Sequence, residues 1–284
     1  MSESDGTPAR DGRPARDGTS TGSPAGHPVR TAAPSGELRA FALQGIPEIR
    51  TGDDLGALIA AAAAARGGLE DGDVVVVAQK AVSKAEGRVV ALAEIVASPQ
   101  AVEIATSGEQ QEDPRRIQAI LDESAALVRV RPPLVIAETR HGFVCASAGV
   151  DASNTGGQER LVLLPLDPDA SARALRERLR ALTGRTVGVI VTDSFGRAWR
   201  TGTTDVAIGC AGIRPLVDWH GQRDADGYVL HATTIAVADE IAGAAELVRG
   251  KLDAAPVAVV RGLDVAGDGT AQELVMPKER DLFR

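Results

Sequence analysis

The stretch TVGVIVTDSFGRAWRTGTTDVAIGCAGIRPLVDWHG, residues 186–221, decides the fold prediction. Its first part, residues 187–191, is short, apolar and rich in β-branched side chains, which is typical of a strand covered on both faces. We expect this strand to stop at Thr192, so that Asp193 and Ser194 follow at its carboxyl end. Open α/β sheets bind ligands at that end of their strands. The stretch therefore predicts a buried sheet with a polar site at its edge.

A purely structural interpretation of the same residues, a strand followed by a turn and solvated arginines, fits this pattern equally well. A second segment favours a functional site. Residues 143–150 are again apolar and lead into Asp151, which is followed by Ser153 and Asn154. Mg²⁺ and Mn²⁺ take hard oxygen ligands, so two aspartates at strand ends predict a cradle for such an ion.

The remaining pattern predicts alternating and antiparallel elements. Residues 89–123 have a helical pattern interrupted by prolines, and the hairpin-like pair at 126–130 and 134–138 argues against a purely doubly wound sheet. Further strands are predicted at 74–78 and 256–260, and further helices at 53–66, from an N-cap at Ser171 to Gly184, and at about 234–249. We therefore expect a mixed α/β (α+β) fold, with mixed parallel and antiparallel sheets, flanking helices and two intertwined subdomains.

Two lysines, Lys80 and Lys84, come just after the strand at 74–78, in a segment (79–88) that we expect to be a turn. Lysines in a turn are usually solvated, but a position beyond a buried strand also favours phosphate binding. The sequence has neither a GxxxxGK[ST] nor a GxGxxG motif, so neither of these fingerprints supports nucleotide binding.

Composition excludes several classes of function. A net charge of −8 argues against a general nucleic-acid partner, because phosphate backbones are bound by clustered lysine and arginine. Cys145 and Cys210 both lie in apolar runs, so we expect buried, reduced thiols rather than nucleophiles. No apolar run approaches 18 residues and the N-terminus has no signal-peptide pattern, so we expect a cytoplasmic chain without a membrane partner.

Residues 1–36 are rich in Gly, Pro, Ser and Thr and have almost no large apolar side chain. Such a segment buries too little apolar surface to offset its ordering entropy. We predict a disordered tail at 1–36 and one catalytic domain at 37–284.

Five segments carry a family resemblance, in family order from about residue 38 to the end. They are GIPEIRTGDDL (45–55), AVSKAEGR (81–88), HGFVCASAGVDASN (141–154), TDSFGRAWRTGTTDVAIGCAGI (192–213) and ADEIAGAAELVRGK (238–251). The chain resembles the coenzyme F420-0:L-glutamate ligases. Several of these segments are long and chemically unusual, which makes the resemblance far more specific than a lone glycine motif.

The resemblance implies a GTP-dependent ligase that joins L-glutamate to the terminal carboxylate of F420-0 through an acyl phosphate and releases GDP and phosphate. It implies Mg²⁺ or Mn²⁺, as one ion or two, with K⁺ as a further candidate, and a homodimer. Its metal ligands would be Asp151 and Asp193, with Ser194 on a second ion, while Arg197 and Arg200 would contact the phosphate or carboxylate of a substrate. Its GTP contacts would be Ile46, Pro47, Glu48, Ile49, Gln79, Lys84 and Asn154.

Two alternatives stay open at this point. One is a metal-dependent regulatory module that binds a nucleotide but catalyses no reaction. The other is a related ligase or kinase that uses the same cradle on a different carboxylate. The resemblance also leaves open whether further gamma-linked glutamates are added.

Overall fold

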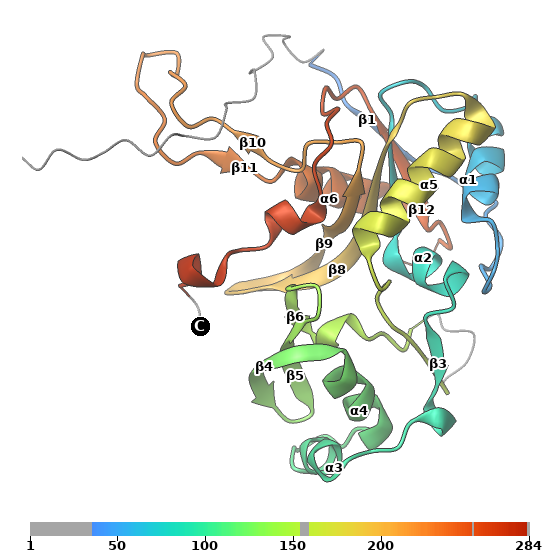
Figure 1. The fold of residues 1–284 in the computed structure, drawn as a ribbon, viewed down its shortest axis with the longest axis vertical. Helices are drawn as coiled ribbons and strands as arrows, with labels where there is room; N and C mark the ends of the chain where they lie inside the picture. Colours follow the sequence, from blue (N-terminus) through green and yellow to red (C-terminus); the bar gives the residue numbers. More distant parts are fainter. Residues whose placement is uncertain (1–35, 154–158, 252, 283–284) are drawn as a thin grey trace, which may run out of the picture. The chain divides into compact units, whose positions relative to one another are not determined.

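The computed structural model describes residues 36–153, 159–251 and 253–282, so the predicted tail at 1–36 lies outside the described residues except for Gly36. A five-stranded sheet organises the described chain, in the order β1-β12-β2-β8-β9 (Figure 1). Its strands are β1 (Arg39–Ala42), β2 (Val74–Ala78), β8 (Gly188–Arg197), β9 (Arg200–Ala211) and β12 (Val257–Arg261). Only β2 and β8 pair in parallel; the other neighbours are antiparallel, which confirms the predicted mixed sheet.

Both faces of this sheet are covered by helices. Val75 and Val77 of β2 belong to a core cluster with α1 (Leu55–Ala64) and α5 (Pro168–Thr183). Val74 and Val76 belong to a second cluster with α6 (Val237–Arg249) on the opposite face. Successive side chains of a strand point to opposite faces, so two covered faces require the continuous apolar run seen in the sequence.

Residues 89–162 form an insertion between α2 (Gln79–Ala85) and α5. The chain leaves the main sheet through β3 (Val89–Ala91) and returns through β7 (Arg160–Val162), and these two strands pair antiparallel. The insertion contains α3 (Pro99–Thr106), α4 (Pro114–Glu123), and a three-stranded antiparallel sheet of β4 (Ser124–Arg131), β5 (Leu134–Thr139) and β6 (Val144–Ala146). Its helices pack on β5 through a core cluster of their own.

Short elements complete the fold. The antiparallel pair β10 (Val217–Asp218) and β11 (Thr234–Ile235) lies between β9 and α6 in the chain. Short 3₁₀ helices occur at Leu92–Glu94, Ser147–Gly149, Ala271–Leu274 and Lys278–Arg280. No helix in the described part of the chain is long and apolar enough to cross a membrane.

The predicted end of the strand at Thr192 is wrong. β8 continues to Arg197 and forms a long hairpin with β9, closed by the pair Arg197 and Arg200. The polar sequence that follows Val191 looks like a turn, but each polar residue has a partner on β9. The register shifts at Val191/Thr192, where β9 carries Ile208 as an extra residue, and such a bulge bends a hairpin.

Three other boundaries also differ from the prediction. Residues 79–85 form the helix α2 rather than a turn, because Gln, Lys and Ala are good helix formers. Residues 89–91 are a strand. The helix predicted to begin after Ser171 begins at Pro168, because the Asp167 side chain accepts a hydrogen bond from the backbone N–H of Ala170, and proline is favoured in the first turn.

Candidate active site

A cavity of about 710 Å³ lies where the pairing between the parallel strands β2 and β8 ends. β2 ends at Ala78, which pairs with Thr192 of β8, and the chain then turns into α2. In the described part of the chain no strand continues this pairing, and the β8 residues Thr192, Asp193 and Ser194 line the cavity. This is the carboxyl end of two parallel strands, where open α/β sheets bind ligands. A volume of this size suits a small-molecule ligand.

Most of the predicted site residues line this one cavity. They are Ile46, Pro47, Glu48, Ile49, Gln79, Lys84, Asp151, Asp193 and Ser194. Asn154 lies outside the described residues. Arg197 and Arg200 do not line the cavity: both are exposed at the closed end of the β8–β9 hairpin, where the Arg197 guanidinium donates to the Thr201 carbonyl oxygen at 3.2 Å.

Asp193 projects from β8 on the side opposite Thr192 and Ser194, as strand alternation requires. The pKa of its carboxyl is raised to about 7, mainly by burial and in part by the negative charges of Asp151 and Asp205, while a hydrogen bond from a backbone N–H and the charge of Lys80 oppose the shift. Among the described residues Asp193 has no ion-pair partner. A half-buried carboxyl of this kind, in a cavity and without a counterion, is suited to bind a cation.

Asp151 comes from the insertion. The backbone of Asp151 makes two hydrogen bonds to Val162, which fix it beside β7, where the chain returns to the main sheet. Burial alone would raise the pKa of its carboxyl, but hydrogen bonds from Lys80 and from the Ser153 N–H, with the charge of Lys80, outweigh burial and lower it. Asp151 is therefore ionised at neutral pH, and two polypeptide segments far apart in sequence each supply one carboxylate.

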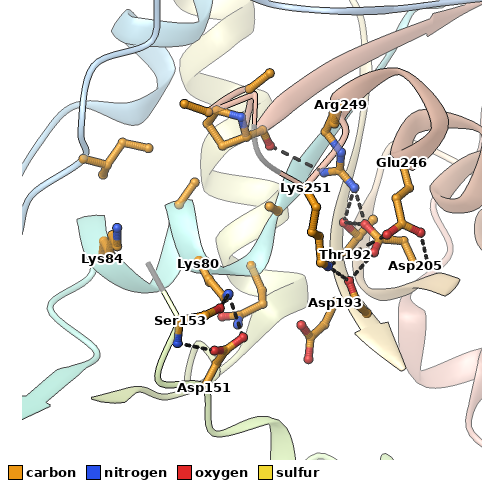
Figure 2. A pocket seen from close by; sticks show the side chains of 18 of the residues that line it. Lys80, Lys84, Asp151, Ser153, Thr192, Asp193, Asp205, Glu246, Arg249 and Lys251 are labelled. Atoms are coloured by element: carbon orange, nitrogen blue, oxygen red, sulfur yellow. Dashed lines mark hydrogen bonds and ion pairs between the residues drawn. The ribbon is translucent and has the colours of Figure 1, made fainter. Parts of the chain in front are cut away.

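Thr192, Asp205 and Arg249 form a buried polar network at the cavity wall (Figure 2). Ser194 is hydrogen-bonded to this network. Its hydroxyl donates to Asp205 Oδ1 at 2.7 Å, and Thr192 Oγ1 donates to Asp205 Oδ2 at 2.9 Å. Arg249, the last residue of α6, forms a buried ion pair with Asp205 and also bonds Thr192 Oγ1 at 3.0 Å. Burial lowers the pKa of Arg249, opposed by the charges of Asp205 and Glu246. The network orients the Ser194 hydroxyl with its proton toward Asp205.

The oxygen of Ser194 also accepts a hydrogen bond from Lys251 Nζ at 2.7 Å. The same ammonium lies 3.9 Å from Glu246 Oε1, and the other Glu246 oxygen accepts from the backbone N–H of Asp205 at 3.0 Å. A cation that used Ser194 as a ligand would have to replace Lys251 there. Ser194 is thus less available to a metal ion than Asp193.

The opposite wall of the cavity is built by the loop at 46–49 and by α2. Ile46 and Ile49 are buried in the main core and anchor the loop, while Glu48 forms an ion pair with Lys84. The Gln79 side chain is buried too: its Oε1 accepts from Ser83 Oγ at 2.9 Å, and its amide nitrogen has no hydrogen-bond partner among the described residues.

The donor set fits a divalent cation of the magnesium type. Among the described residues, no group of three His, Cys, Asp or Glu side chains is arranged to hold a metal without help. Mg²⁺ is commonly bound by one or two carboxylates, with waters and substrate phosphates as the remaining ligands. Asp151 and Asp193 would supply the two carboxylates.

Several lining residues were not predicted as functional, namely Ser153, Thr192, Asp205, Glu246, Arg249 and Lys251. Lys80 was noted only for its position after a strand. A signal for Arg249 existed, because it follows the buried Ile241 and Ala245 at a spacing of four residues. Its apolar neighbour Val248 is exposed instead.

The two cysteines have no role in this chemistry. Both are free and buried, as predicted. Burial raises the pKa of Cys145 to about 12, with a smaller contribution from the charge of Asp193, and burial also raises the pKa of Cys210. Thiols of this kind are poor nucleophiles.

Comparison with known proteins agrees with this geometry. A model of the family "F420-0:Gamma-glutamyl ligase" matches residues 45–262. Three curated proteins, each called coenzyme F420:L-glutamate ligase, are similar to the chain at 43% identity. The protein of Methanothermobacter thermautotrophicus aligns over 247 residues, 85% of this chain and 97% of its own length. That of Methanocaldococcus jannaschii aligns over 218 residues (76% and 86%), and that of Archaeoglobus fulgidus over 249 residues (87% and 96%).

Proposed function

The chain belongs to the F420-0:gamma-glutamyl ligase family, and from this premise we propose that it is a ligase that joins L-glutamate to coenzyme F420-0 at the expense of GTP. The observation that carries the proposal is the convergence of all five family-like segments, those at 45–55, 81–88, 141–154, 192–213 and 238–251, on one cavity. The cavity brings the proposed cation ligands Asp151 and Asp193 together with three lysines, which suits the handling of a triphosphate and a carboxylate together.

The chemistry requires activation of a carboxylate. Direct attack of an amine on a carboxylate would have to expel oxide, which is a very poor leaving group. In the proposed sequence an oxygen of the F420-0 carboxylate attacks the γ-phosphorus of GTP and GDP leaves. The amine of glutamate then attacks the acyl carbon of the acyl phosphate, inorganic phosphate leaves, and the amine loses a proton to give the amide.

The residues of the cavity would provide binding and orientation for these steps. Asp151 and Asp193 would hold a divalent cation, Mg²⁺ or Mn²⁺, which when bound supplies charge neutralisation between the anionic substrates. Lys84, Glu48 and the loop around them would contact the nucleotide. A second ion on Ser194 belongs to the same proposal, with the condition that it replaces Lys251.

Arg197 and Arg200 remain candidates for the substrate's phosphate or carboxylate. They lie outside the cavity, so their contacts would be with the part of a substrate that extends from it along the hairpin. A cytoplasmic setting is part of the same proposal, supported by two free, buried cysteines.

We also propose a homodimer. β4 is an edge strand of its sheet, and its apolar side chains Leu127, Val128 and Val130 are exposed, as is Leu134, the first residue of β5. Edge strands with exposed apolar residues are prone to pair with another chain, and most such assemblies are symmetric dimers. Light scattering after size exclusion tests this, and Val128→Lys together with Val130→Lys should give a monomer.

One assay tests the ligase proposal directly. The protein is incubated with GTP, Mn²⁺, L-glutamate and F420-0, and the product is weighed by mass spectrometry. A product heavier than F420-0 by one glutamyl residue, formed together with GDP, supports the proposal; products heavier by further glutamyl residues would show chain extension. Binding of GTP without turnover of any carboxylate would instead favour a regulatory module, and turnover of a different carboxylate would favour a related ligase.

A further inference from the structure

Lys80 forms an ion pair with Asp151, a carboxylate that the proposed cation would need as a ligand. Its ammonium lies 2.6 Å from Asp151 Oδ2 and 2.6 Å from Ser153 Oγ, while the Ser153 N–H bonds Asp151 Oδ1 at 2.6 Å (Figure 2). Both oxygens of Asp151 are therefore engaged within the chain.

Asp193 differs from the other four carboxylates of the cavity, which are Glu48, Asp151, Asp205 and Glu246. Each of these four has a basic partner within 4 Å, whereas in the described part of the chain Asp193 has none. A cation that binds Asp193 displaces no basic partner among the described residues, but it cannot use Asp151 Oδ2 while Lys80 remains there. An ammonium and a divalent ion on one oxygen repel each other strongly at such short separation.

The released ammonium would remain in the cavity. Lys80 lies at the start of α2, the helix that also carries Lys84, and its side chain is 23% exposed, so it is not locked in a packed core. A lysine ammonium on its flexible four-carbon stem is a common partner of phosphate oxygens. A triphosphate bound against α2 would offer such an oxygen.

We propose that Lys80 is an exchangeable counterion: it pairs with Asp151 in the cation-free protein and moves to a phosphate oxygen of the triphosphate when a divalent cation takes Asp151. This inference rests on the proposed function, because it assumes the same cation site. It makes the cation and the triphosphate bind cooperatively. The coupling must be reciprocal, so each ligand tightens the other by the same factor.

The other role that the contacts allow is structural, in which the Lys80–Asp151 pair only ties α2 to the insertion. The two roles differ in what removal of the charge does. A structural pair would lose stability without affecting the coupling between ligands. An exchangeable counterion, once removed, leaves Asp151 free for a cation and leaves the triphosphate without its ammonium.

The test measures Mn²⁺ binding to the full chain from the electron paramagnetic resonance signal of free Mn²⁺, with and without a non-hydrolysable GTP analogue. Lys80→Met and Lys80→Gln are compared with the wild type. Lys278→Met is the matched control, because Lys278 also forms an ion pair, with Glu138, but does not line the cavity. The equilibrium between free Mn²⁺ and free analogue is the same in every sample, so differences between variants report the protein.

Without the analogue, both Lys80 variants should bind Mn²⁺ about five-fold more tightly than the wild type, the scale of a partly exposed ion pair, while Lys278→Met keeps the wild-type affinity. With the analogue, the gain in Mn²⁺ affinity should be smaller in the Lys80 variants than in the wild type. The exchange is wrong if both Lys80 variants bind Mn²⁺ no more tightly than the wild type without the analogue. It is also wrong if the analogue raises their Mn²⁺ affinity as much as it raises that of the wild type. In both cases the cation site itself still stands. No Mn²⁺ binding by the wild type in either condition overturns the cation site and the exchange together.

Discussion

Ser194 and Asp205 lie directly opposite each other on β8 and β9, and the Ser194 hydroxyl donates a 2.7 Å hydrogen bond to the Asp205 carboxylate. Since Thr192 and Arg249 also donate to Asp205, one buried carboxylate joins the main hairpin to the end of α6. The wall of the cavity depends on this junction. We therefore expect Asp205 and Arg249 to stabilise the fold and, through the hydrogen bond to Ser194, to position that hydroxyl in the site.

Asp205→Asn should lower the free energy of unfolding by about 3–5 kcal/mol, because it leaves the buried Arg249 guanidinium without its counterion. Urea denaturation measures this. Arg185→Met provides the matched control, since the Arg185–Asp71 pair is exposed and should contribute less than about 1 kcal/mol. Equal, small losses in the two variants would show that the Asp205–Arg249 pair does not hold the hairpin to α6.

Mn²⁺ affinity should depend on pH through Asp193. Its pKa is raised to about 7, so the carboxyl is protonated in mildly acidic solution, and a cation must displace that proton. Affinity should rise about ten-fold per pH unit below pH 7 and level off above it. Calorimetry in buffers of different ionisation enthalpy should detect the released proton. Affinity that does not change between pH 5 and 8 would contradict the assignment.

The same raised pKa has a consequence for the cation-free protein. A carboxyl whose folded pKa lies above its unfolded value stabilises the fold fully at pH values below the unfolded pKa, and this contribution is lost as the pH rises through about 7. The melting temperature of the wild-type protein, compared with that of Asp193→Asn, should therefore fall as the pH is raised from 5 to 8. Saturating Mn²⁺ should remove that loss.

Replacing Arg197 and Arg200 together by Ala should raise the KM of a substrate about ten-fold, the scale of one charge-assisted hydrogen bond. Mn²⁺ affinity should not change, because neither residue lines the cavity. Steady-state kinetics with each substrate varied in turn measures the effect, with the exposed Arg173→Ala as control. Wild-type KM values for every substrate would remove both arginines from the site.

Much of the fold could be predicted because its signals are local. The runs at 74–78 and 187–191 need two covered faces, and α1, α5 and α6 cover them. Gly184 ends α5 in a left-handed conformation, as a helix-ending glycine does. The hairpin beyond Thr192 was missed because its polar residues resemble a turn until the pairing with β9 is known.

In the candidate site, too, some residues have a local signal in the sequence and others do not. Asp151 and Asp193 follow apolar runs, so their position could be anticipated from the chain alone, and both line the cavity. Asp205 could not, because its importance arises from a cross-strand pair. Helical spacing indicates that Arg249 lies on the buried face of α6, but its ion pair with Asp205 follows only from how α6 packs on β9. Lys80 and Lys251 carry no distinctive pattern, and only their contacts with Asp151 and Ser194 show where their charges lie.

If Asp193 and Asp151 bind the divalent cation on which turnover depends, Asp193→Asn removes one of the two carboxylates that hold it. The substitution keeps the size of the side chain and removes its charge. The fold should survive, while Mn²⁺-dependent kcat with GTP, L-glutamate and F420-0 should fall by about three orders of magnitude or more, because metal charge stabilisation contributes several kcal/mol in such reactions. Asp151→Asn should act similarly, and the double variant should lose much less than the sum. An Asp193→Asn protein with normal turnover, less stable by only about 1 kcal/mol as for a lost capping residue, would contradict the account.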